Sequence, residues 1–162
     1  MKKIHIFMLA TGLALAAQTT SFAASTTGNL AVSAIVSAQC IIQSAAIPFG
    51  TYSASAVQQN AQIAVNCSNG TSYTISLDAG SGTGATTAAR KLANTAGGSS
   101  LNYGLYQDAA RTKSWGNASG SDTIAGVGSG TTQNIPVYGY IPGGQTSTAG
   151  NYSDVVAITL AY

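Results

Sequence analysis

Residues 150–162, GNYSDVVAITLAY, decide how the rest of this chain is interpreted. From Tyr152 to Tyr162, larger residues alternate with smaller ones at the two-residue period of a β-strand. Both faces of the expected strand are fairly apolar, so it needs a neighbouring strand on each edge. It runs to the last residue, and no residues remain to supply a following strand.

The rest of the sequence has the same character, with short alternating runs between clusters of Gly, Ser, Thr and Asn and no helical period. This pattern predicts one all-β domain, a sandwich or a barrel, in a chain of 162 residues. The expected strands are Leu30–Ser37, Cys40–Ile47, Ala61–Cys67, Tyr73–Asp78, Leu101–Tyr106, Gln133–Ile141 and Tyr152–Tyr162. Residues 79–100 and 116–131 are expected to be long loops or weak edge strands.

The first 23 residues have the pattern of a secretory signal peptide. Two lysines precede a largely apolar run over residues 6–17, and small residues stand at Ser21 and Ala23, before Ala24. The run is too short to span a bilayer as a helix. We expect cleavage between Ala23 and Ala24, export of the protein, and no integral membrane segment in the mature chain.

Removal of residues 1–23 leaves a chain poor in chemically active side chains. The only histidine, His5, is lost, and the sequence contains no glutamate. The charged residues that remain are Arg90, Lys91, Arg111 and Lys113 against Asp78, Asp108, Asp122 and Asp154, for a net charge of zero. Scattered cations do not suit nucleic acid, and the absence of imidazole argues against a catalytic nucleophile or a zinc site. We expect no catalytic residues, bound metal or cofactor.

Cys40 and Cys67 are the two cysteines of the sequence. An even number of cysteines in an exported chain predicts a disulfide. A reactive thiol pair is disfavoured because no neighbouring cation or helix start would lower a thiol pKa.

The start of the mature chain allows two interpretations. One face of the expected strand there carries small and medium residues two positions apart: Gly28, Leu30, Val32, Ala34 and Val36. The segment could be an ordinary first strand of the domain's own sheet. It could also be a strand that lies in the hydrophobic groove of another chain.

Three further stretches carry a resemblance to a known family. They are LNYGLYQDAARTKSWG at 101–116, IPVYGYIPG at 135–143 and the terminal 150–162, and Gly28 stands twelve residues before Cys40. Together they resemble the spore coat protein U domain family, which includes subunits of archaic chaperone–usher pili. The resemblance covers residues 28–162. It implies a single immunoglobulin-like β-sandwich that lacks its last strand, formed by residues 40–162 and preceded by a donor-strand extension at 24–39.

The resemblance also implies a function and partners. The chain would be a structural, non-enzymatic subunit of a surface pilus that supports adhesion or biofilm formation. Its partners would be a periplasmic chaperone, an outer-membrane usher and copies of itself or related subunits. It would pass through the periplasm to the cell surface. The donor face would be Gly28, Leu30, Val32, Ala34 and Val36, with Ala34 smaller than the aliphatic residue expected there. The groove and the chaperone-facing edge would be formed by Val156, Ile158, Leu160 and Tyr162.

Some roles stay open at the level of sequence. The aromatic residues of Tyr103–Trp115 could form a receptor site, but core packing is the commoner role of such residues. Asp108 and Arg111 could pair or cap a turn. Two other functions compete with the fibre subunit: a self-complete, lectin-like binding module, and a coat or matrix protein that forms no pili.

Overall fold

A computed structural model of the protein describes residues 22–43 and 45–162. Backbone contacts separate residues 36–162, which form one compact unit, from the described residues 22–35 that precede them. The expected signal sequence lies outside the described residues except for its last positions. No helix long and apolar enough to cross a membrane occurs in the part of the chain that is described.

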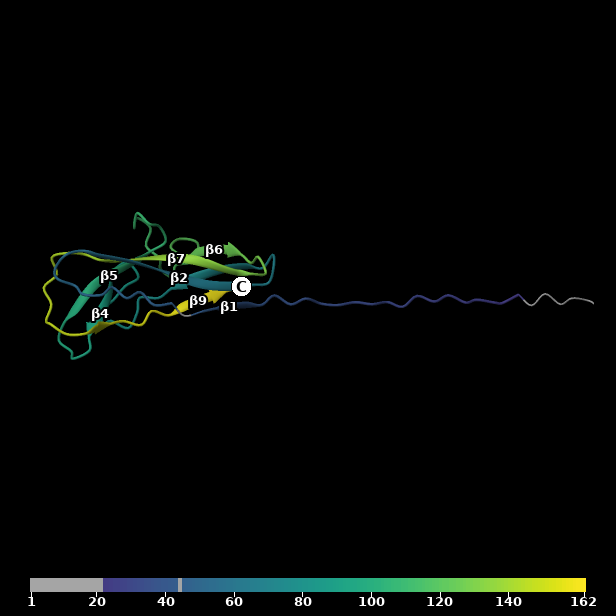
Figure 1. The fold of residues 1–162 in the computed structure, drawn as a ribbon, viewed down its shortest axis with the longest axis horizontal. Helices are drawn as coiled ribbons and strands as arrows, with labels where there is room; N and C mark the ends of the chain where they lie inside the picture. Colours follow the sequence, from purple (N-terminus) through teal and green to yellow (C-terminus); the bar gives the residue numbers. More distant parts are fainter. Residues whose placement is uncertain (1–21, 44) are drawn as a thin grey trace, which may run out of the picture. The chain divides into compact units, whose positions relative to one another are not determined.

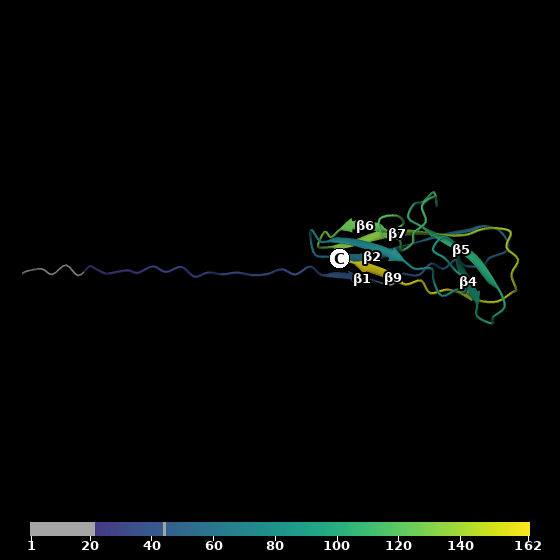
Figure 2. The same ribbon diagram turned by 180° about the vertical axis from the view of Figure 1, so that it is seen from behind.

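Nine strands build the compact unit (Figure 1). Their bounds are β1 Cys40–Ile42, β2 Val57–Cys67, β3 Ser72–Leu77, β4 Arg90–Asn94, β5 Ser100–Tyr106, β6 Ile124–Val127, β7 Thr132–Ile141, β8 Tyr152–Ser153 and β9 Ile158–Ala161. The strands form a six-stranded sheet in the order β1-β2-β7-β5-β4-β8 and a three-stranded sheet in the order β6-β3-β9. β2 and β7 are paired over most of their length and lie side by side in both views (Figure 1, Figure 2).

The core lies between the two sheets and is supplied by alternate residues of their strands. Ile63 and Val65 of β2 and Val137 of β7 meet Ile75 and Leu77 of β3 there, all at 2% exposure or less. Burial of alternate side chains from two facing antiparallel sheets is the arrangement of a β-sandwich. The fold is therefore the all-β, immunoglobulin-like sandwich that was predicted.

Four of the expected strands occur within a few residues of their predicted bounds, as β2, β3, β5 and β7. The prediction for Cys40–Ile47 is too long, because β1 ends at Ile42. The interpretation of 116–131 as a loop or weak edge strand agrees with β6, a four-residue strand at the edge of its sheet, whereas the same interpretation of 79–100 missed the place of β4. β4 is not an outermost strand, since it lies between β5 and β8.

The prediction of a strand at Leu30–Ser37 is wrong for the described chain. Residues 22–35 run as an extended trace without a strand arrow (Figure 1), and strand structure begins only at Cys40. An alternating sequence does not form a stable strand until its backbone pairs with a neighbour.

The prediction of one continuous strand from Tyr152 to Tyr162 is also wrong. β8 ends at Ser153 and pairs with β4 of the six-stranded sheet, whereas β9 begins at Ile158 and pairs with β3 of the three-stranded sheet. Residues 154–157 carry the chain from one sheet to the other. Side chains hold this crossing: Asp154 Oδ1 accepts from Ser81 N at 2.7 Å, and Asp78 Oδ1 accepts from Ala157 N at 2.8 Å.

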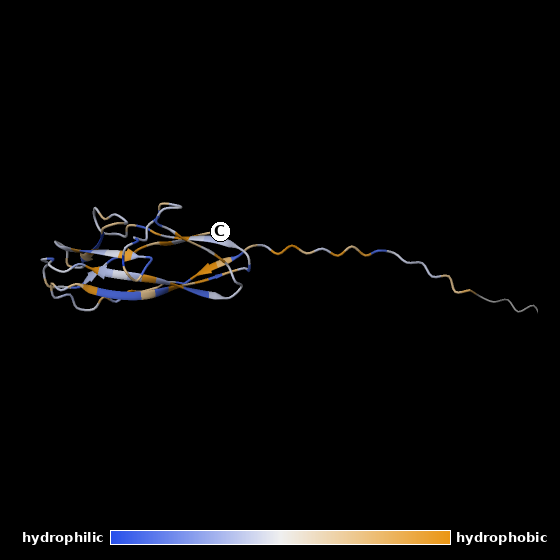
Figure 3. Ribbon diagram, turned by 90° about the horizontal axis from the view of Figure 1, so that it is seen from above, coloured by the Kyte–Doolittle hydropathy of each residue, from blue (hydrophilic) through white to orange (hydrophobic). Residues whose placement is uncertain are grey.

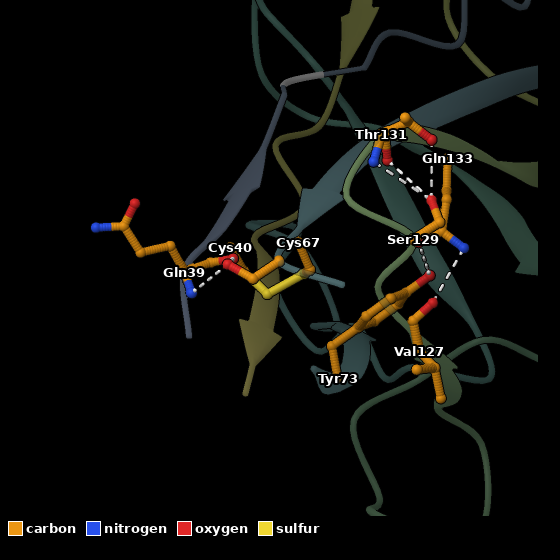
Figure 4. Close-up of a disulfide and its surroundings, with 9 residues drawn as sticks. Gln39, Cys40, Cys67, Tyr73, Val127, Ser129, Thr131 and Gln133 are labelled. Atoms are coloured by element: carbon orange, nitrogen blue, oxygen red, sulfur yellow. Dashed lines mark hydrogen bonds between the residues drawn. A yellow bond between two sulfur atoms is a disulfide. The ribbon is translucent and has the colours of Figure 1, made fainter. Parts of the chain in front are cut away.

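The predicted disulfide between Cys40 and Cys67 is present. The two cysteines are also directly opposite each other in the pairing of β1 with β2 (Figure 4). Gln39, which precedes the disulfide, accepts a backbone hydrogen bond of 2.8 Å from Ser68. The disulfide and this bond fix the point at which the chain enters the sandwich.

Candidate functional site: an open groove in the sandwich

The sandwich contains a cavity of about 970 Å³ whose floor is apolar. The floor is formed by core side chains of both sheets, namely Ile63, Leu77, Leu101, Tyr103, Leu105, Val137 and Ile141. Two stretches line the sides, residues 45–52 and residues 147–154. The second stretch contains the short strand β8, and Val156 and Ile158 continue this side. An apolar floor of this kind is suited to contact with apolar side chains.

The first wall, residues 45–51, leaves its backbone unpaired. None of its N–H or C=O groups bonds to another described backbone group, although Ile47 and Phe49 pack against the core. The Phe49 ring meets Tyr103 edge to face, with centroids 5.9 Å apart. Tyr52 anchors the end of this wall, because its hydroxyl donates to Pro142 O at 3.0 Å and accepts from Gln145 N at 2.9 Å.

The second wall is the terminal segment. Val156 and Ile158, two of the four residues expected at the groove, line the cavity. Leu160 packs against the core but does not line the cavity, and Tyr162 is 63% exposed and also lies outside it. β9 is the last strand of its sheet, so one of its edges has no neighbour among the described strands. The cavity is thus bordered by unpaired backbone at residues 45–51 and by the free edge of β9.

A polar cluster lies within the lining of the groove. The Tyr103 hydroxyl donates to Asp154 Oδ2 at 2.7 Å, and the Ser81 hydroxyl donates to Asp154 Oδ1 at 2.7 Å. Burial, reinforced by the bond to Asp154, raises the pKa of Tyr103 well above its usual range. The cluster joins the floor of the groove to the stretch between β8 and β9.

The predicted donor residues lie in an exposed, extended segment. Leu30 is 87% and Val32 85% exposed, and Val36 is exposed to a similar degree. Ile35, on the opposite face of the predicted strand, is exposed as well. Orange, apolar stretches recur along this segment (Figure 3). Apolar side chains left in water at regular spacing are a common mark of a binding segment.

The Tyr103–Trp115 stretch is mainly part of the fold. Trp115 is fully buried and its ring N–H donates to Ile75 O at 3.1 Å. Asp108 caps a turn, since its carboxylate accepts from Thr112 N and from Lys113 N. Sequence reasoning missed the wall at residues 45–51, where Pro48 and Gly50 were the available signals that the strand would not continue.

A family model, a curated relative and a solved structure all match this chain. The Spore Coat Protein U domain model matches residues 26–159. Protein U of Myxococcus xanthus is 32% identical over an alignment of 156 positions, and the match covers 86% of this chain and 87% of that protein. A chain of the chaperone–tip adhesion subunit pre-assembly complex of archaic chaperone–usher Csu pili, from Acinetobacter baumannii, superposes with a TM-score of 0.57 at 24% identity. That match covers 78% of this chain but only 40% of the solved one, so it shows a shared fold.

Proposed function

Because the chain belongs to the Spore Coat Protein U domain family, we propose that it is a non-catalytic subunit of a surface fibre. In this fibre, the extension of one copy, residues 24–39, fills the groove of another. The single observation that carries the proposal is the apolar groove, bordered by the unpaired backbone of residues 45–51 and by the free edge of β9. A segment added as a strand would supply both the missing hydrogen bonds and the missing apolar side chains.

The extension has the chemistry that such a groove requires. Leu30, Val32 and Val36 recur on one face, and each larger aliphatic side chain that leaves water contributes about 1.5–3 kcal/mol. Each backbone hydrogen bond adds about 0.5–1.5 kcal/mol. At Gly28 the donor backbone would come close to the groove of the other copy. Ala34 would fill its part of the groove less fully than a larger residue would.

The arrangement favours a fibre over a closed dimer. Donor and groove are different surfaces of the same subunit, so a contact between copies is head to tail. Such contacts generate an open filament unless the rotation happens to close a ring. We infer that the fibre supports adhesion or biofilm formation.

An open groove is also an aggregation hazard before assembly. We infer that a periplasmic chaperone covers it, along the edge that includes Ile158 and Leu160, and that an outer-membrane usher receives the subunit. The solved complex that contains the chain of similar fold consists of a chaperone and a pilus tip subunit, which supports this inference. Export would use residues 1–23, with cleavage between Ala23 and Ala24.

The test compares single substitutions in the extension. Secreted wild-type protein, co-expressed with its chaperone, is run on an SDS gel without boiling, beside Val32→Asp on the donor face and Ser33→Asp on the opposite face. We expect a heat-sensitive ladder for wild type and Ser33→Asp, and monomer for Val32→Asp and for a deletion of residues 24–37. A folded, soluble monomer in all four samples would contradict strand exchange and favour a self-complete binding module.

A coat or matrix component is the second candidate, favoured by the match to Protein U along nearly the whole chain. Immunogold labelling of intact cells separates the two functions. Label along filaments supports the fibre, whereas a uniform layer on the cell or spore supports the coat.

A further inference from the structure

The outer face of the six-stranded sheet carries a row of tyrosines that the groove does not use. Val137 and Ile141 of β7 point into the core, so Tyr138 and Tyr140 lie on the opposite face. Tyr106 of β5 is directly opposite Tyr138 and shares that face. On the other side of β7, β2 contributes exposed amides at three outward positions. We call the set Tyr106, Tyr138, Tyr140, Gln58, Asn60 and Gln62 the tyrosine face.

Gly104 keeps the row continuous. It is opposite Tyr140 in the pairing of β5 with β7, and a Cβ at this position would come within 2.6 Å of the Tyr106 ring. The Tyr106 ring therefore lies over Gly104, on the face that β5 shares with β7. Any larger residue at 104 would push the ring away from the sheet.

The loop after β5 holds one end of the face in place. Arg111 has a left-handed backbone, with φ of 58°, and its guanidinium lies 6.0 Å from the centre of the Tyr138 ring. The guanidinium donates to Gly139 O at 3.3 Å, to Ala109 O at 2.9 Å and to Asn60 Oδ1 at 3.1 Å. All three of its nitrogens are used within the protein. It thereby orders Tyr138 and Asn60.

The side chains of the tyrosine face indicate which class of ligand could bind there. Tyrosine gives a broad, rigid contact with a polar tip, and its electron-rich ring face attracts polarised C–H groups. The amides of Gln58 and Gln62 offer both donors and an acceptor to hydroxyl groups, and Asn60, whose Oδ1 accepts from Arg111, offers its N–H donors. The face contains no carboxylate, and Arg111 directs its three nitrogens to oxygens of the protein, so the tyrosines and amides are the groups left to contact a ligand. We propose that the tyrosine face binds a neutral polysaccharide, with sugar rings on the tyrosines and hydroxyl groups on the amides.

This site is independent of strand exchange, since none of its residues lines the groove. In an assembly of many subunits the face would recur once in each copy. Once one face is bound to a polymer, the other copies are held near it at a high effective concentration. Weak binding at each face would then add up to strong attachment of the whole assembly.

The test is calorimetric titration of the secreted full-length protein with cellohexaose, maltohexaose and, as the anionic comparison, hexagalacturonate. We expect saturable binding of at least one neutral hexasaccharide and weaker binding of hexagalacturonate. Tyr138→Ala and Tyr140→Ala should each weaken the neutral ligand about tenfold or more. Tyr138→Phe keeps the ring and should bind nearly as wild type does. Val127→Ala, an exposed apolar position on the other sheet, is the matched control and should change nothing.

Thermal unfolding of every variant shows whether the sandwich is intact. Should a tyrosine variant fail to fold, Gln58→Ala tests the same face, because this exposed amide has no packing role, and weaker binding is again expected. No binding of either neutral hexasaccharide would overturn the proposal, as would equal binding by wild type and the face variants. Tyrosine-dependent self-association without saccharide binding would also overturn it, in favour of a contact between protein chains.

Discussion

The Tyr103 hydroxyl and Asp154 Oδ2 are 2.7 Å apart, and this hydrogen bond ties the floor of the groove to the point where the terminal segment changes sheets. Tyr103 lies on β5 of the six-stranded sheet, whereas Asp154 follows β8 and precedes the crossing to β9. The bond therefore connects the two structures that define the groove. Its loss should affect both the stability of the sandwich and the position of one wall.

The first prediction concerns alkaline pH. The pKa of Tyr103 is raised in the folded state by burial and by Asp154, while in the unfolded chain it is near the ordinary value of about 10. The unfolded state therefore loses this proton first as the pH rises, and the free energy of unfolding falls from about pH 10 upward. The contribution is fully present below that pH. Urea unfolding at pH 8 and pH 11 measures the difference.

Tyr103→Phe provides the control for this pH dependence. At pH 8 it should lower the free energy of unfolding by about 1–3 kcal/mol, because Asp154 loses a buried partner. Between pH 8 and pH 11 it should lose less stability than wild type. If Tyr103→Phe lost as much stability between pH 8 and pH 11 as wild type does, Tyr103 would not be the group responsible.

The second prediction concerns Arg90, which is fully buried and donates to four backbone carbonyls. They belong to Leu77, Asp78, Thr87 and Trp115, at 2.8–3.1 Å. Arg90→Met would leave these acceptors without a donor and should cost about 3 kcal/mol or more. Arg90→Lys restores the charge but not the planar fork, and should recover only part of the loss. Arg111→Lys, at a half-buried position outside the core, serves as the comparison, and thermal unfolding is the measurement.

Much of the sandwich was predictable from the sequence because its central strands alternate regularly. Ile63 and Val65, or Tyr73 and Ile75, show the pattern directly. β4 was missed because its first residue is an arginine whose burial depends on carbonyls from distant segments. The break after Ser153 was missed for a similar reason, since bonds from residues more than seventy positions away hold it.

The groove was predicted only in part. Val156 and Ile158 were identified because they belong to an alternating run that ends the chain. The opposite wall, residues 45–51, does not alternate, and its importance comes from backbone groups that remain unpaired. A local sequence pattern does not reveal which backbone segments lack a neighbouring strand. This wall was therefore recognised only in the three-dimensional structure.

The third prediction concerns the disulfide. Cys40 and Cys67 are 27 residues apart, and on the chain-entropy account their link stabilises the fold by about 3.5 kcal/mol. The double substitution Cys40→Ser with Cys67→Ser should lower the free energy of unfolding by a comparable amount, measured by urea unfolding. Wild type in reducing buffer should show the same loss. The double variant should not respond to reductant at all, which separates the effect of the bond from that of the substitutions.

The fourth prediction follows from the proposed strand exchange and concerns Ala34, the smallest side chain of the donor face after Gly28. Ala34→Val adds two carbon atoms that would enter the groove, at about 0.8 kcal/mol for each buried carbon. We expect assembled protein to separate into monomers at a higher temperature in SDS. The measurement is the loss of the ladder on a gel as samples are heated in steps.

Ile35→Val is the matched control for Ala34→Val, because it changes an aliphatic residue on the opposite face of the same segment. It should leave the dissociation temperature unchanged. If both substitutions shifted that temperature equally, the extension would not present one face to a groove. If Ala34→Val lowered it while Ile35→Val did not, the face would be correct but the pocket at this position too shallow for valine. The two faces of the extension can thus be distinguished even if the fit at residue 34 is tight.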